Sequence, residues 1–172
     1  MARNGWRFND SRTAILYAAS VEALALLELV VRPGWESVRE IVVVSIDVPD
    51  GSVVDLDDVG VTLPSNWNAR PVARDSQSIG AAFLRAIDAR PPRTKAICGL
   101  RVPSVISTTD FNVLLDPRQE ASYSVADWTR VPFETLRTTR PAEQGAPLHS
   151  PAARRYLVRA RQSDAADPDH PT

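Results

Sequence analysis

The chain has 172 residues, of which 44% are hydrophobic and 24% charged, and its formal net charge is −1 at pH 7. This length and apolar content suffice for one domain with its own hydrophobic core but are short for two domains. The nearly balanced charge gives no bulk attraction to a polyanion, so the composition argues against direct nucleic-acid binding.

Cysteine and histidine usage narrows the chemistry further. Cys98 is the only cysteine in the sequence, which excludes an intramolecular disulfide and a cysteine-rich zinc site. The only histidines, His149 and His170, fall in the C-terminal region, so we expect no metal site. The N-terminus shows no signal-peptide pattern, and no window approaches about 18 consecutive apolar residues. We therefore expect a cytoplasmic protein that does not enter a membrane.

The first part of the chain predicts a strand followed by a buried helix. Residues 13–19 form a short apolar run that is typical of a buried strand. Ser20 is placed to cap a helix over 21–31, and a Pro-Gly pair at 33–34 ends that helix. The helix is apolar around most of its circumference, and Glu28 is the only charge in its middle. Because burying a carboxylate without a partner is costly, we expect Glu28 to have a specific role.

The middle of the chain alternates short strands with a second helix. A β-branched run at 40–48 predicts a strand, and a shorter strand is predicted at 53–56. Helical spacing of apolar residues predicts a helix over 77–89, which Pro residues end. The apolar runs at 96–102 and 112–115 predict two further strands. Because most connections are short, we predict an α+β fold with a mixed or antiparallel sheet and a few helices.

The composition changes at about residue 140. We therefore predict a domain at 1–140 and a C-terminal tail at 141–172 that is rich in Pro, Ala and Arg. Within the tail, a Ser-Pro pair predicts the start of a short basic helix over 151–161. We expect the remainder of the tail to be disordered.

Three chemically suited side chains stand in apolar surroundings near the N-terminus: Arg7, Tyr17 and Glu28. An arginine recognises phosphate in a bidentate manner, and a tyrosine offers a flat face with a polar tip. A partly desolvated carboxylate stabilises positive charge that develops in a water-poor cleft. Together they predict a site for a pyrophosphate-linked dinucleotide.

Each of these residues also has a purely structural interpretation. Arg7 and Glu28 would form a buried ion pair, and Tyr17 would be a core residue whose hydroxyl is satisfied. Ser104 follows a proline and would simply be a turn residue, and Ser78 would belong to a helix cap.

An ordered series of short motifs runs through the first 137 residues. It comprises Gly-Trp-Arg-Phe-Asn at 5–9, Leu-Tyr at 16–17, Ala-Leu-Ala-Leu-Leu-Glu at 23–28, Leu-Pro at 63–64 with Trp67, Gln-Ser-Ile-Gly at 77–80, Arg-Val-Pro-Ser at 101–104 and Asn-Val-Leu-Leu-Asp-Pro at 112–117. In order and spacing this series resembles the RES domain, a family named for arginine, glutamate and serine and found as the toxin of Xre-RES toxin-antitoxin modules.

The resemblance implies a fold like that of ADP-ribosyltransferases and an enzyme that consumes NAD as a substrate, with no separate cofactor. By this resemblance, Arg7 contacts the NAD phosphates and Tyr17 packs near the nicotinamide or its ribose. Glu28 stabilises the oxocarbenium-like ribose, and Ser104 holds the ribose or the nicotinamide amide. Ser78 and Asn112 complete the expected set of NAD-binding residues. No metal is needed, because nicotinamide in the cation is already a good leaving group.

The resemblance further implies an intracellular toxin that degrades NAD and is restrained by a cognate Xre-type antitoxin, with oligomers formed through that complex. The nicotinamide-ribose bond would be cleaved by hydrolysis or phosphorolysis. The first alternative is a protein ADP-ribosyltransferase on the same fold. The second alternative is a truncated, inactive RES-like domain that serves as a binding partner. The sequence leaves the acceptor open between water, phosphate and protein.

The chain also departs from the family pattern. That pattern usually has an upstream strand with an arginine, so we expect either that this strand is absent or that the start site is misplaced. Asp116 stands where the family usually has an asparagine, and Arg118 and Arg32 stand where histidine is common. These departures favour altered substrate preference or weakened activity.

Overall fold

A computed structural model describes residues 5–31, 41–91, 96–131 and 153–158 of the chain, with the last segment described by its backbone only. Within these residues the fold is α+β, as predicted. The two α-helices are α1 (Glu22–Val30) and α2 (Arg74–Asp88), and the two 3₁₀ helices are η2 (Asp57–Val59) and η3 (Pro117–Ser122). The strands are β1 (Leu16–Ala19), β2 (Ile41–Pro49), β3 (Val53–Val54), β4 (Gly99–Pro103), β5 (Phe111–Leu115), β6 (Ser124–Val131) and β7 (Ala153–Val158).

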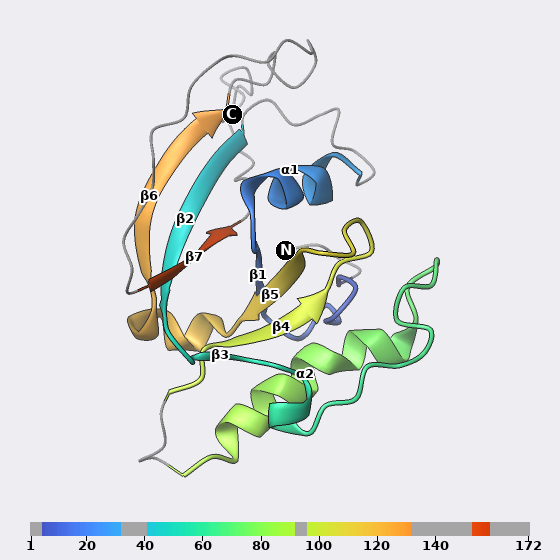
Figure 1. Cartoon of the computed structure of the whole chain (residues 1–172). Helices are drawn as coiled ribbons and strands as arrows, with labels where there is room; N and C mark the ends of the chain where they lie inside the picture. Colours follow the sequence, from blue (N-terminus) through green and yellow to red (C-terminus); the bar gives the residue numbers. More distant parts are fainter. Residues whose placement is uncertain (1–4, 32–40, 92–95, 132–152, 159–172) are drawn as a thin grey trace, which may run out of the picture.

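These strands form one mixed sheet in the order β3-β4-β5-β1-β7-β2-β6. β3 and β4 pair in parallel, and all other neighbours pair antiparallel. Figure 1 shows a strongly curved sheet with α2 packed across one end and α1 beside β1 and β2 at the other. The predicted mixed or antiparallel sheet is therefore confirmed.

The C-terminal segment differs from the prediction. We predicted a short helix over 151–161, but Ala153–Val158 forms strand β7 between β1 and β2. An isolated helix of this length is marginal in water, whereas a strand at this place satisfies the backbone groups of both neighbours. Part of the predicted tail thus belongs to the sheet. The boundary at residue 140 stays a prediction.

Several local predictions also change. Ser20 does not cap α1, because the cap position is Val21 and the Ser20 hydroxyl accepts a hydrogen bond from the backbone N of Phe111 at 3.2 Å. Helix α2 begins three residues before the predicted start at residue 77. Strand β6 was not predicted. The predicted helix end at 33–34, Arg32, both histidines and most of 141–172 lie outside the described residues.

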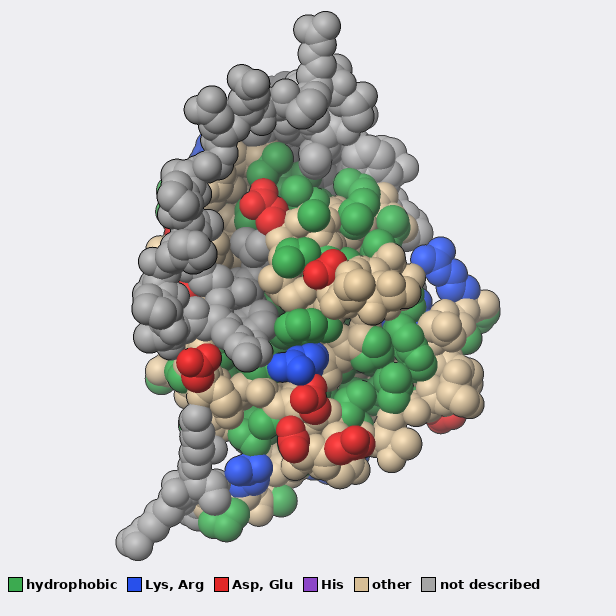
Figure 2. All heavy atoms as spheres, viewed as in Figure 1, with side chains coloured by type: hydrophobic (Ala, Val, Ile, Leu, Met, Phe, Trp, Pro, Cys, Tyr) green, Lys and Arg blue, Asp and Glu red, His purple; other side chains and the backbone are tan. Residues whose placement is uncertain are grey.

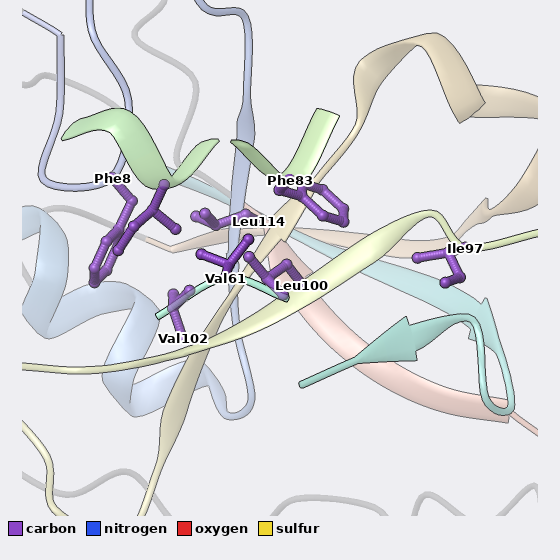
Figure 3. Packing of buried hydrophobic residues seen from close by; sticks show 8 residues of the cluster. Phe8, Val61, Phe83, Ile97, Leu100, Val102 and Leu114 are labelled. Atoms are coloured by element: carbon purple, nitrogen blue, oxygen red, sulfur yellow. The ribbon is translucent and has the colours of Figure 1, made fainter. Parts of the chain in front are cut away.

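Register shows that the two α-helices share one face of the sheet. Tyr17 pairs with Leu114 and Asn112 with Val102, so their side chains point to the same face. α2 packs on this face through the core cluster in Figure 3, where Phe83 lies with buried residues of β4, β5 and the N-terminal segment. α1 packs beside it on β2, with Leu26 and Leu29 against Ile41 and Val43. The strip of sheet between the two helices carries Tyr17 and Asn112.

Candidate active site

A carboxylate held by two neutral donors lies where α1 meets the ends of β4 and β5. Oε1 of Glu28 accepts a hydrogen bond from Asn112 Nδ2 at 2.8 Å and another from Ser104 Oγ at 3.1 Å. Glu28 is half-buried, and Ser104 and Asn112 are each 8% exposed. The second oxygen, Oε2, makes no hydrogen bond with any described residue. One carboxylate oxygen is therefore fixed by the protein, and the other remains available to a ligand.

The strands and the loop between them place these donors. Asn112 stands in β5 opposite Val102, and Ser104 is the first residue after β4. The Ser104 hydroxyl also accepts the backbone N–H of Ile106 at 3.0 Å, so its own proton is directed to Glu28. The carboxylate of Asp110 accepts a hydrogen bond from Ser107 Oγ at 2.9 Å further along the loop. A short, internally bonded loop thus holds Ser104 beside α1.

The Tyr17 hydroxyl forms hydrogen bonds within the protein. The Tyr17 OH accepts the backbone N–H of Phe8 at 3.0 Å and donates to Asn9 Oδ1 at 2.8 Å. Its ring lies 5.8 Å from the Trp6 ring, centroid to centroid. The interpretation of Tyr17 as a residue with a satisfied hydroxyl is therefore correct. Its hydroxyl is thus bonded within the protein, and its ring is half-buried.

Asn9 is a site-shaping residue that the sequence reasoning missed. It is 5% exposed, and its Nδ2 donates to the carbonyls of Asp10 at 2.9 Å and Thr13 at 2.7 Å. Together with the Tyr17 bond, these contacts fix the turn that presents Arg7. The only sequence signal was its place in the Gly-Trp-Arg-Phe-Asn motif, because backbone acceptors have no signature of their own.

The turn of residues 6–9 lies directly against α2. The backbone N–H of Gly80 donates to the Phe8 carbonyl at 2.7 Å, and Gln77 Nε2 donates to the Trp6 carbonyl at 3.2 Å. A Cβ at Gly80 would stand 2.6 Å from that Phe8 oxygen, so only glycine permits this approach. This contact explains the glycine in the Gln-Ser-Ile-Gly motif.

Arg7 is anchored by backbone carbonyls and not by an ion pair. Its Nη1 donates to the carbonyl oxygens of Trp67 at 2.8 Å and Ala69 at 3.2 Å. No salt bridge joins Arg7 to Glu28, so the buried-pair interpretation is wrong. Burial lowers the pKa of Arg7 below its ordinary value and the charge of Arg70 lowers it further, while Glu28 and Tyr17 act in the opposite direction. Arg7 is thus within electrostatic reach of both Tyr17 and Glu28.

Ser78 does not join this group. It is exposed on α2, and its hydroxyl donates to the Asp75 carbonyl of its own helix at 2.7 Å. It shares no hydrogen bond with the other five candidate residues. A role in ligand binding stays a prediction for Ser78, and its observed contact is the local one expected of a serine in the first turns of a helix.

The departure from the family pattern at Asp116 has a local explanation. Asp116 is fully buried and caps η3, and its carboxylate accepts hydrogen bonds from the backbone N and the guanidinium of Arg118 at 2.9 to 3.2 Å. Arg118 also pairs with Asp88 at 3.0 Å, and these carboxylates raise its pKa above the ordinary value. The charge introduced at Asp116 is therefore neutralised within the structure.

Among the described residues, no group of three or more His, Cys, Asp or Glu side chains is placed to hold a metal ion. A search of the described helices for a span long and apolar enough to cross a bilayer finds none.

Comparison with known proteins identifies the family. The RES domain model matches residues 1–135, so the chain belongs to the RES domain family. This match includes Arg7, Tyr17, Glu28, Ser104 and Asn112.

Three named relatives are each similar over about two thirds of the chain. Toxin Res of Yersinia enterocolitica serotype O:8 / biotype 1B is 29% identical over 118 residues, which cover 68% of this chain and 71% of the relative. Toxin Res of Photorhabdus laumondii subsp. laumondii is 32% identical over 114 residues, covering 66% of this chain and 67% of the relative. The Prs ADP-ribosylating toxin of Sphingobium sp. is 38% identical over 117 residues, covering 66% of each chain.

Proposed function

We propose that this protein is an enzyme that cleaves the nicotinamide-ribose bond of NAD. The observation that carries the proposal is the Glu28 carboxylate, with one oxygen held by Ser104 and Asn112 and the other free of protein hydrogen bonds within the described residues. Membership of the RES family and the names of the relatives support an enzymatic toxin as the class.

The reaction requires stabilisation of positive charge on the ribose. The bond between ribose C1′ and the nicotinamide nitrogen breaks, and its electron pair neutralises the cationic ring as it leaves. In our proposal Glu28 Oε2 faces the developing oxocarbenium ion. A carboxylate that is already fixed needs no reorganisation at the moment of reaction, which is the condition for effective electrostatic stabilisation.

Ser104 and Asn112 then act as positioning residues. The sequence interpretation gave Ser104 a contact with the ribose or the nicotinamide amide. Its observed hydrogen bond to Glu28 supports a different task, in which both donors keep the carboxylate in one orientation. Neither donor is charged, so these two hydrogen bonds bring no positive charge to the carboxylate.

The phosphates of NAD would be held by Arg7. Both protons of Nη1 are occupied by the carbonyls of Trp67 and Ala69, and no described residue bonds to the edge formed by Nε and Nη2. That edge is a parallel pair of donors suited to two oxygens of one phosphate. Tyr17 would place its ring against the nicotinamide or its ribose, since its hydroxyl is already bonded.

The acceptor at C1′ decides the product. In hydrolysis, water forms the new bond to C1′, releases a proton and yields ADP-ribose; in phosphorolysis, phosphate does so and yields a phosphorylated ADP-ribose. Incubation of purified protein with NAD, with and without phosphate, followed by mass spectrometry of the products distinguishes them. An unchanged NAD concentration in both incubations would refute the proposal.

Transfer of ADP-ribose to a protein is a second candidate. It is favoured by one observation, the similarity to the Sphingobium protein whose name describes an ADP-ribosylating toxin. Incubation of a bacterial lysate with the purified protein and a biotin-labelled NAD tests it. Covalent label on a protein band that requires Glu28 supports transfer, and free ADP-ribose without labelled protein excludes it.

An inactive binding domain is the least supported alternative. The candidate set around Glu28 is intact, and the charge at Asp116 is neutralised by Arg118. Both features are compatible with an active enzyme, and the product analysis above also tests this alternative.

We also propose that the protein acts in the cytoplasm and is restrained by an Xre-type antitoxin. Apolar side chains on and next to α1 are exposed: Val21 at 39%, Leu27 at 46% and Val31 at 47%. Figure 2 shows hydrophobic side chains gathered on the part of the surface around α1. A partner that covers them would lie on the helix that carries Glu28. Co-expression with the product of the adjacent reading frame, followed by co-purification, tests this proposal.

A further inference from the structure

A second arginine lies next to the proposed phosphate-binding residue. Arg7 Nη1 donates to the carbonyl oxygen of Ala69, which is covalently followed by Arg70. The guanidinium of Arg7 is therefore held against the backbone at the point where the Arg70 side chain begins. Arg70 is exposed and forms no side-chain hydrogen bond or ion pair within the described parts of the chain.

Among the described residues, neither Arg7 nor Arg70 forms an ion pair, although the charge of Glu28 acts on Arg7. Two other arginines are ion-paired, Arg101 with Asp55 at 3.3 Å and Arg118 with Asp116 at 2.9 Å. Arg7 instead lies partly buried on neutral carbonyls, and the charge of Arg70 adds to the effect of burial in lowering its pKa. Keeping like charges close together is unfavourable in the free protein, and a bound anion would relieve it.

We propose that Arg70 is the second half of a phosphate clamp, in which Arg7 holds one phosphate of a dinucleotide and Arg70 the other. The ligand class is a pyrophosphate diester, as in NAD and ADP-ribose, so the inference rests on the proposed function and extends it to a residue outside the family motifs. The anchored Arg7 supplies bidentate geometry, and the exposed Arg70 supplies a second positive charge.

Arg90 offers a control variant with the same change in charge at the other end of α2. Arg90 is also exposed and follows α2 at its far end, where its backbone N–H bonds to the Ile87 carbonyl. Arg90→Gln removes the same charge as Arg70→Gln but at the opposite end of α2. Since both side chains are exposed, thermal unfolding of both variants should match that of the wild type.

Titration calorimetry with ADP-ribose, inorganic pyrophosphate and nicotinamide riboside separates the phosphate contacts from the rest of the ligand. Arg70→Gln should raise the Kd of ADP-ribose and of pyrophosphate about tenfold, as expected for one partly exposed charged contact. The Kd of nicotinamide riboside, which has no phosphate, should stay within about twofold, and so should every Kd of Arg90→Gln. With NAD as substrate, Arg70→Gln should raise KM about tenfold and leave kcat within about twofold, because the contact is remote from the reacting bond.

Equal behaviour of Arg70→Gln and Arg90→Gln would overturn the clamp, as would a wild-type protein that binds neither ADP-ribose nor pyrophosphate. A wild-type protein that binds ADP-ribose in an Arg70-dependent manner but leaves NAD intact would support the clamp and refute the proposed NAD cleavage. The two failures are therefore distinguishable.

Discussion

Asn112 offers the sharpest test of how the Glu28 carboxylate is held. Its Nδ2 makes the shorter of the two hydrogen bonds to Oε1, at 2.8 Å against 3.1 Å from Ser104. Asn112→Ala removes this donor and leaves Ser104 as the one remaining donor among the described residues. The carboxylate should then sample several orientations, so that only a fraction of the enzyme is ready for the transition state.

The size of the effect follows from the kind of bond. A hydrogen bond to a charged group contributes about 1.5–3 kcal/mol, and about 1.4 kcal/mol corresponds to a tenfold change in rate, so kcat should fall about 10- to 100-fold. The KM for NAD should change by less than about threefold, because Asn112 acts through Glu28 and not on the ground-state substrate. Steady-state kinetics of nicotinamide release measures both constants.

A double-mutant cycle separates positioning from a direct contact with the substrate. Glu28→Gln alone should lower kcat by about two to three orders of magnitude, as for loss of one electrostatic stabiliser. Adding Asn112→Ala to Glu28→Gln should then cost little more, since the group to be positioned no longer carries the charge. If Asn112→Ala lowers kcat by the same factor in both backgrounds, the positioning argument is wrong.

Three further predictions concern residues around this site. Arg7→Lys keeps the positive charge but loses the pair of parallel guanidinium donors. It should therefore raise the Kd of NAD clearly while lowering the melting temperature only slightly, and a large stability loss with unchanged affinity would contradict phosphate recognition. Tyr17→Phe leaves the Phe8 N–H without its partner, so the free energy of unfolding in urea should fall by about 1–3 kcal/mol, and an unchanged value would contradict the structural role of the hydroxyl. Burial raises the pKa of the Cys98 thiol, so a disulfide reagent at neutral pH should modify it only after unfolding; rapid modification of the native protein would show that Cys98 is accessible.

Much of the fold follows from sequence periodicity. The β-branched run at 40–48 corresponds to β2, which buries residues on both faces of the sheet, and the helical spacing at 77–89 corresponds to α2, which buries one apolar face. β6 escaped prediction because nearly all of its residues are exposed, including Val125 and Trp128, so no burial period marks it. β7 was not predicted because its backbone pairs with β1 and β2, which are distant in the sequence. The local composition, rich in Pro, Ala and Arg, carries no signal for such pairing.

The candidate site shows a similar division. Arg7, Tyr17, Glu28, Ser104 and Asn112 were found through their motifs, because the family resemblance places distant residues together. The carbonyls that anchor Arg7 had no sequence signal, since any residue type supplies a backbone acceptor. The pairing of Asp116 with Arg118 was within reach, because an aspartate before a proline is a common start of a helical turn.

Direct measurement of nicotinamide release tests the central claim. Purified wild-type protein and the Glu28→Gln variant are incubated with NAD at equal concentration, and free nicotinamide is quantified over time by chromatography. The account predicts steady release by the wild type and a rate lower by about two to three orders of magnitude in the variant, with NAD binding largely retained. Equal rates in the two proteins, or no release by the wild type, would contradict the account.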